Sequence, residues 1–146
     1  MSHTFLFKES LWVLEGEYYD AYGNVYSAVG QSETTHREEL WIEERIVRVF
    51  FDEPIAFATR YEIEPFGPGK TTTRWKACNR ILGNLEGRFI VGGDSIRSTF
   101  RSADGRFSGR ERLQIVGDGI YRSRRVLLDG DRILSSWGME LRSVAG

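Results

Sequence analysis

Three Asp-Gly pairs divide the last third of the chain, at residues 104–105, 118–119 and 129–130. The segments around them alternate apolar and polar residues. In residues 107–116, for example, one face is made by Phe107, Gly109, Glu111, Leu113 and Ile115. A period of two is typical of a β-strand, and Asp-Gly supplies the positive φ that tight hairpin turns require. We therefore predict that the last 50 residues form a four-stranded antiparallel meander.

The first half of the chain predicts similar hairpins, with one ambiguous segment. Gly23-Asn24 separates two strand-like runs, and residues 30–33 indicate another turn. Residues 36–51 suit a helix by propensity, yet their apolar residues alternate as in strands. We favour two strands with a turn at residues 43–45, and a helix remains the alternative. A short helix at residues 4–10 is expected to plug one end of the fold.

About ten short strands at intervals of eight to twelve residues predict a barrel or a sandwich. Hairpin connections without long returns favour an up-and-down barrel over a Greek-key sandwich. Closure also removes the exposed sheet edges that promote aggregation. The expected fold is all-β: one domain over residues 1–146, a single antiparallel barrel of about 8–10 strands.

Composition narrows the class of protein. The 146 residues carry a net charge of −1, which argues against nucleic acid as a partner, because phosphate binding usually needs a basic excess. Arginines nevertheless crowd the second half, either as solvated strand faces or as a basic mouth that attracts an anionic ligand. No apolar run approaches the length that spans a bilayer, so we expect no membrane association and a cytoplasmic location.

The segments "GEYYD" at residues 16–20 and "SSWGMELR" at 135–142 give the chain a resemblance to the calycin superfamily, the group of lipocalins and fatty-acid-binding-like barrels. Lipocalins place Gly-X-Trp on the first strand, and here Gly16-Glu17-Tyr18 carries tyrosine instead. The resemblance implies that Arg142 packs across that aromatic residue. The tyrosine suits a diverged, bacterial-type relative, similar to the bilin-lyase branch. The resemblance implies a barrel able to hold one small ligand, in some members as a homodimer.

Polar residues on the apolar faces are the first candidates for a site. Glu111, Ser98 and Ser135 each lie between apolar neighbours of alternating strands. A buried carboxylate needs a partner or a shifted pKa, and Arg124 or Arg125 on the following strand could supply the partner. Glu111 is then either half of a structural ion pair or a group that orients a ligand or exchanges a proton.

Aromatic residues complete the candidate pocket, although each could equally be core. The predicted ligand-binding residues are Trp75, Ser98, Phe100, Glu111, Tyr121, Arg124, Ser135 and Trp137. The only histidines, His3 and His36, do not make a metal site, and we read His36 as a surface residue. The single cysteine, Cys78, is expected to be free and buried. No cofactor is indicated.

The predicted function is sequestration of a small apolar or amphipathic ligand, anionic if the arginines contact it, inside the barrel. One alternative is an enzyme on the same barrel, resembling a bilin lyase or an isomerase, with Glu111 as acid or base. Another is a protein-interaction module whose interior is filled by its own side chains. Barrels of this kind host many functions, so the fold does not decide among them.

Overall fold

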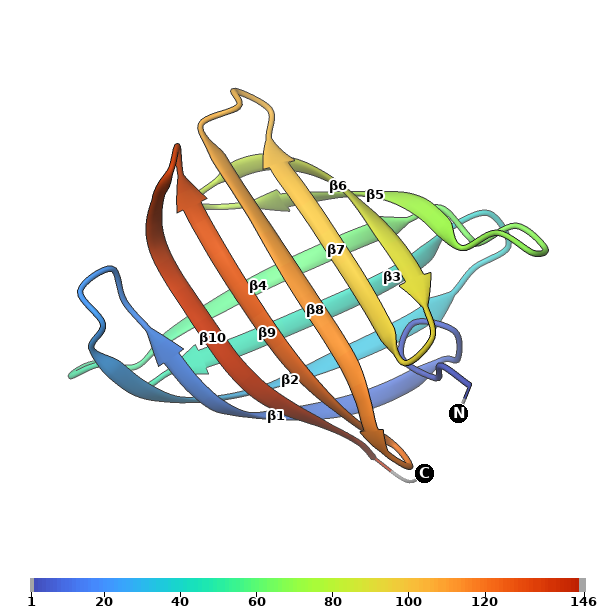
Figure 1. The fold of residues 1–146 in the computed structure, drawn as a ribbon, viewed down its shortest axis with the longest axis horizontal. Coiled ribbons are helices and arrows are strands. Elements are labelled where there is room, and N and C mark those ends of the chain that lie inside the picture. Colours follow the sequence, from blue (N-terminus) through green and yellow to red (C-terminus); the bar gives the residue numbers. More distant parts are fainter. Residues whose placement is uncertain (1, 145–146) are drawn as a thin grey trace.

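A computed structural model describes residues 2–144 as a closed antiparallel barrel in which each strand pairs with its sequence neighbours and β1 closes the ring against β10 (Figure 1). The strands are β1 Ser10–Tyr19, β2 Val25–His36, β3 Trp41–Val49, β4 Ile55–Ile63, β5 Thr72–Asn79, β6 Gly83–Gly92, β7 Ser95–Ser102, β8 Phe107–Gly117, β9 Ile120–Asp129 and β10 Arg132–Ser143. The prediction of an all-β up-and-down barrel is confirmed. Within the described residues, no helix is long and apolar enough to cross a membrane.

The turns follow the local sequence. Gly105, Gly119 and Gly130, the glycines of the three Asp-Gly pairs, have φ angles of 77°, 62° and 61°. Only glycine adopts this left-handed region without cost, so each pair fixes the point at which the chain reverses. The meander predicted for the last 50 residues is therefore present as β7 to β10.

Two local predictions were wrong. Residues 41–49 form one continuous strand without a turn at residues 43–45, because Glu43 and Arg45 lie on the inner face in the same alternation as Val47 and Val49. Two charged residues at inward positions made the strand look interrupted. The N-terminal segment forms a turn, Thr4 O accepting a hydrogen bond from Lys8 N, instead of a helix.

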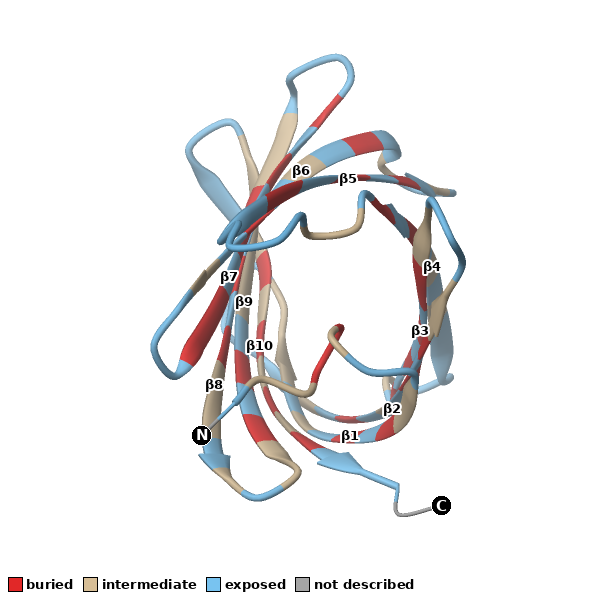
Figure 2. Ribbon diagram, turned by 90° about the vertical axis from the view of Figure 1, so that its right-hand side faces the viewer, coloured by how far each residue is buried: buried red, intermediate tan, exposed pale blue. Residues whose placement is uncertain are grey.

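The N-terminal segment nevertheless plugs one end of the barrel, as expected. Phe5 and Leu6 are fully buried, and the segment folds into the barrel mouth (Figure 2). The Phe5 ring packs edge-on against Trp12 with centroids 5.6 Å apart. The Leu6 carbonyl oxygen lies 2.6 Å from His36 Nε2, and the Tyr121 hydroxyl accepts a hydrogen bond from Thr4 N. The plugged end is thus a conventional aromatic core.

Candidate functional site: the barrel interior

Strand register places one row of inward side chains around half of the barrel wall. Residues directly opposite one another across β7, β8, β9, β10 and β1 are, in order, Ser98, Glu111, Arg125, Trp137 and Tyr18. Inward residues recur every second position along a strand, so this row lies in one layer of the interior. Polar and aromatic groups therefore meet in the middle of the barrel.

Glu111 is joined to the opposite wall through Arg45 on β3. Arg45 Nη1 donates to both Glu111 oxygens at 3.0 and 3.1 Å. Its Nε and Nη2 donate to the two oxygens of Glu43, at 2.7 and 3.1 Å. All three side chains are buried. We call Glu43, Arg45 and Glu111 the buried triad.

Hydroxyl groups donate one further hydrogen bond to each carboxylate of the triad. Ser32 donates to Glu43 Oε2 at 2.7 Å, and Ser123 donates to Glu111 Oε2 at 2.8 Å. The Trp137 indole N–H in turn donates to Ser123 Oγ at 3.2 Å. Buried charges are tolerated when they are paired and hydrogen-bonded in this way. The triad is a closed network that spans the barrel.

The network also sets the charge states. Burial disfavours ionised Glu111, but the charges of Arg45 and Arg125 and the Ser123 hydrogen bond outweigh it, so the pKa of Glu111 lies below its ordinary value. Burial opposes the charge on Arg45 too, yet the two carboxylates raise the pKa of Arg45 well above its usual range. Glu111 is therefore an ionised hydrogen-bond acceptor.

The other half of the barrel is hollow. A cavity of about 390 Å³ lies between the buried triad and the turns at the unplugged end. Its apolar wall is made by Tyr18, Val47, Val49, Phe57, Tyr61, Leu82, Phe107, Leu127, Leu134 and Trp137. A volume of several hundred cubic ångström with mostly apolar walls and a few polar groups is typical of a small-molecule site.

Arg125 is the cation that this cavity leaves without a direct partner. Its guanidinium lies over the rings of Trp137 and Phe100, 4.7 and 5.2 Å from their centroids. No carboxylate of residues 2–144 comes within 4.0 Å of it, and it donates no hydrogen bond to these residues. Its charge balances the net negative charge of the triad, while its N–H groups are free for a ligand.

The rim of the cavity carries further charge. Asp129 pairs with Arg106 at 3.0 Å and lies 3.7 Å from Arg132. The charge of Asp104 also acts on Arg106, so the charges at the entrance are close to balanced. The two arginines still offer N–H donors to an anionic group that enters here.

Ser135 and Trp137 are the two predicted ligand-binding residues that line the cavity. Trp75, Ser98 and Phe100 point inward but belong to the packed wall, where the Trp75 indole N–H donates to Ser98 Oγ at 3.1 Å. Tyr121 lies at the plugged end, its hydroxyl 2.9 Å from His3 Nδ1.

The predicted residue Arg124 is exposed on the outer face and does not line this cavity. Arg125 is the inward residue of this pair. The partner of Glu111 is Arg45, instead of Arg124 or Arg125. Sequence reasoning missed Arg45 because the turn expected at residues 43–45 broke the alternation that would have pointed it inward.

Three smaller expectations also fail. Arg142 is exposed and pairs with Glu140, whereas Tyr18 lies opposite Trp137 near the other end of β1. Cys78 is free but exposed. His36 is half-buried and stacks on Trp41 with ring centroids 4.0 Å apart.

Comparison with known proteins supports the fold alone. No family model matches the sequence, and no curated protein matches it. Among solved structures, the crystal structure of Rv2717c from M. tuberculosis superimposes with a TM-score of 0.70 at 11% identity, covering 94% of this chain and 92% of that one. The S-type phycobiliprotein lyase CPES from Guillardia theta gives a TM-score of 0.64 at 8% identity, covering 95% and 89%.

These likenesses extend over nearly the whole of each chain, so the class defined by the fold is a lipocalin-like β-barrel. The particular member described here has one end plugged by its own N-terminal segment, a buried ionic triad at mid-height and a hollow, arginine-bearing half.

Proposed function

We propose that this protein binds a small amphipathic ligand with an apolar body and an anionic group in the hollow half of the barrel. The observation that carries the proposal is the cavity of about 390 Å³, whose wall is largely apolar and aromatic. Burial of an apolar ligand there gains about 25 cal/mol for each Å² removed from water. A diverged calycin barrel that sequesters its ligand is the reading that these features support best.

Arg125 is the proposed anchor for the anionic group. A guanidinium held over two aromatic rings is pre-oriented, and an arginine fork matches a carboxylate with two parallel hydrogen bonds. Two arginines that line the cavity at its rim, Arg106 and Arg132, offer further donors to the same group as it enters.

The two alternatives are less well supported. An acid or base is most effective when its pKa is near the working pH, whereas the pKa of Glu111 is lowered and both its oxygens accept hydrogen bonds from Arg45. A module with a filled interior does not account for the cavity.

One observation suggests a more specific class of ligand to test. The structural similarity to a phycobiliprotein lyase makes a bilin a reasonable probe, because a linear tetrapyrrole combines an apolar body with propionate carboxylates. At 8% identity the likeness supports the choice of probe and no more.

The experiment is a calorimetric titration with decanoate and with decanol, which share a chain and differ in charge. We expect the wild type to bind both, decanoate more tightly. Arg125→Gln should weaken decanoate binding by at least about 10-fold and leave decanol within about 2-fold. The control is Arg124→Gln, which removes the same charge one residue away on the outer face.

Three results would overturn the proposal: no binding of either probe or of biliverdin by the wild type, an unchanged decanoate affinity in Arg125→Gln, or equal losses in the two variants. A Leu127→Trp variant provides an independent check, since the larger ring fills the cavity. It should abolish binding of both probes while the protein remains folded by circular dichroism.

A further inference from the structure

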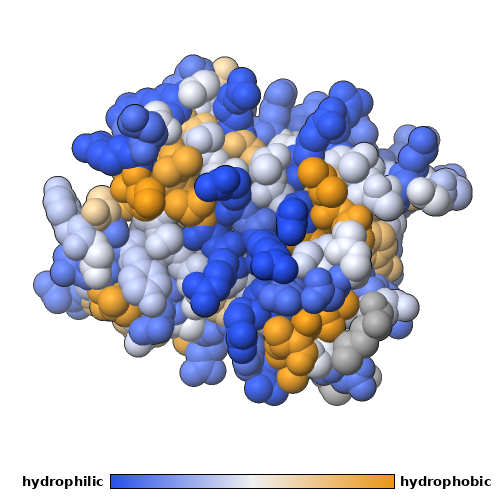
Figure 3. Space-filling view, viewed as in Figure 1, coloured by the Kyte–Doolittle hydropathy of each residue, from blue (hydrophilic) through white to orange (hydrophobic). Residues whose placement is uncertain are grey.

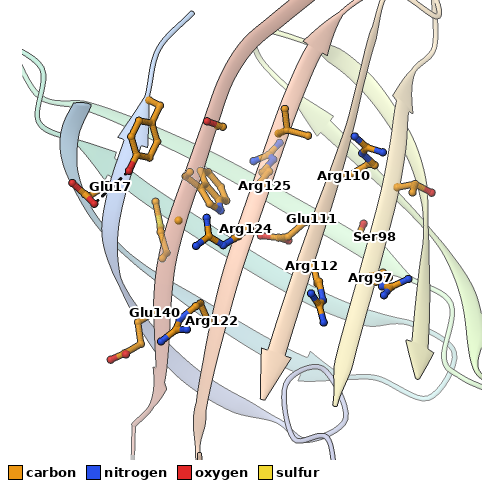
Figure 4. A pocket seen from close by; sticks show the side chains of 17 residues that line it. Glu17, Arg97, Ser98, Arg110, Glu111, Arg112, Arg122, Arg124, Arg125 and Glu140 are labelled. Carbon is orange, nitrogen blue, oxygen red and sulfur yellow. Dashed lines mark hydrogen bonds between the residues drawn. The ribbon is translucent and has the colours of Figure 1, made fainter. Parts of the chain in front are cut away.

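A second groove opens on the outer face of the barrel, and its lining also includes the inward residues Ser98, Glu111, Arg125 and Trp137. It has a volume of about 610 Å³ and runs over β7, β8, β9, β10 and β1. Hydrophilic side chains gather at the centre of this face (Figure 3). Five exposed arginines from three neighbouring strands line the groove (Figure 4): Arg97, Arg110, Arg112, Arg122 and Arg124. We call these five residues the arginine face.

The arginine face places like charges directly beside one another. Arg97 lies directly opposite Arg112, and Arg112 lies directly opposite Arg124. Like charges at opposed cross-strand positions destabilise a sheet. The chain as a whole has a net charge of −1, so this crowding does not follow from a basic composition.

Glu140 lies opposite Arg122 in the sheet, but no direct ion pair relieves the repulsion among the described residues. Within residues 2–144, none of the five guanidinium groups has a carboxylate oxygen within 4.0 Å, whereas Arg74 and Arg142 on the same barrel surface pair with Glu64 and Glu140. The one side-chain hydrogen bond made by the face in this part of the chain runs from Arg112 Nε to Ser95 Oγ, at 3.2 Å. Most of the donors therefore have no protein partner.

Gly138 and two glutamates shape the groove beside the arginines. Gly138 lies opposite both Arg124 and Glu17 in the sheet, and a side chain added at Gly138 would meet no atom within 4 Å. This position is therefore a gap beside the arginines. Glu140 lies directly opposite Arg122, and Glu17 lines the groove on β1, so carboxylates bound the groove on the side of β10 and β1.

We propose that the arginine face binds a small molecule that carries two or more phosphate groups. Arginine forks recognise phosphate oxygens bidentately, and neighbouring strands set the arginines about 4.8 Å apart at the backbone, so that one multivalent anion can contact several. The groove volume is that of a small-molecule site. The flanking glutamates disfavour an extended polyanion such as nucleic acid or an acidic protein segment.

The direct test is calorimetric titration with inorganic tripolyphosphate at physiological salt. We expect a dissociation constant below about 100 µM. The double variant Arg112→Gln/Arg124→Gln should weaken binding by at least about 10-fold. The matched control is Arg60→Gln/Arg101→Gln, which removes two exposed arginines that do not line the groove and should change the affinity by less than about 2-fold.

Parallel titrations with other anions identify which chemical class the arginine face binds. ATP is titrated beside tripolyphosphate, because a nucleotide and an inorganic chain carry the same phosphates, and binding of either one that depends on the arginine face supports the proposal. Equal loss in the control pair would overturn it, since attraction would then come from overall charge. Equal affinity for hexaglutamate would also overturn it and assign the face to an acidic protein segment.

This inference does not depend on the interior site. Arg112→Gln/Arg124→Gln should bind decanoate as the wild type does, while Leu127→Trp, at a residue that lines the interior cavity and not the groove, should retain tripolyphosphate binding to within about 3-fold. The two proposals can therefore fail separately.

Discussion

Arg45 and Glu111 are 66 residues apart in the sequence, yet they face each other across the barrel and share two hydrogen bonds of 3.0 and 3.1 Å. With Glu43, which lies on the same strand as Arg45, they connect β3 to β8 through the interior. The triad separates the plugged half of the barrel from the hollow half, so it defines the floor of the proposed ligand site. The first two predictions concern its energetics.

Removal of Arg45 alone should be severely destabilising. Arg45→Met leaves two buried carboxylates without their cation, and breaking a buried ion pair in this way costs about 3–5 kcal/mol. The variant Glu43→Leu/Arg45→Met/Glu111→Leu removes all three charges together and should recover most of that loss. Urea unfolding followed by tryptophan fluorescence measures both. A cost below about 1 kcal/mol for Arg45→Met would contradict the prediction.

Stability should fall in acid partly through Glu111. Its pKa is lower in the folded protein than in the unfolded chain, so its contribution is complete above the unfolded value of about 4.3 and is lost as pH falls through the lower folded value. The urea midpoint should therefore decline below about pH 4.3 less steeply in Glu111→Gln than in the wild type. Glu86→Gln, at an exposed position, is the control and should keep the wild-type slope.

Substitution of alanine for two glycines inside strands should change the free energy of unfolding by different amounts. A Cβ at Gly109 would collide with the Phe100 ring and would lie 2.8 Å from the Val126 carbonyl oxygen, so Gly109→Ala should cost about 1–3 kcal/mol by overpacking. A Cβ at Gly138 meets nothing within 4 Å, and Gly138→Ala should stay within about 0.5 kcal/mol of the wild type. Equal unfolding midpoints for the two variants would refute the assignment.

The N-terminal plug should contribute to the stability of the fold as a core residue does. Phe5→Ala removes a fully buried ring that packs on Trp12 and Tyr121, at an expected cost of about 3–5 kcal/mol. Phe50→Ala, where the ring is 42% exposed, is the matched control and should cost less than about 1 kcal/mol. Thermal denaturation distinguishes the two. Because the plug and the cavity lie at opposite ends, folded Phe5→Ala should still bind decanoate.

Local sequence determined the fold. Period-two alternation and Asp-Gly turns specify strands and reversals through interactions between residues close in sequence. Short hairpins then make each strand pair with the next one along the chain. The same alternation indicated that Glu111, Ser135 and Trp137 point inward, which the structure confirms. Alternation failed where charged residues took inward positions, at Glu43 and Arg45, since hydropathy then gives the wrong face.

The tertiary structure alone decided which inward residues meet. The sequence shows that Glu111 needs a partner, but its partner comes from β3 across the closed barrel, and no local pattern encodes a contact of that separation. Whether the interior is filled also depends on closure: Phe5 and Leu6 fill one end, and the other stays hollow. Arg124 and Arg125, adjacent in sequence, differ in surroundings for the same reason, because a barrel has an inside and an outside, and register assigns each side chain to one of them.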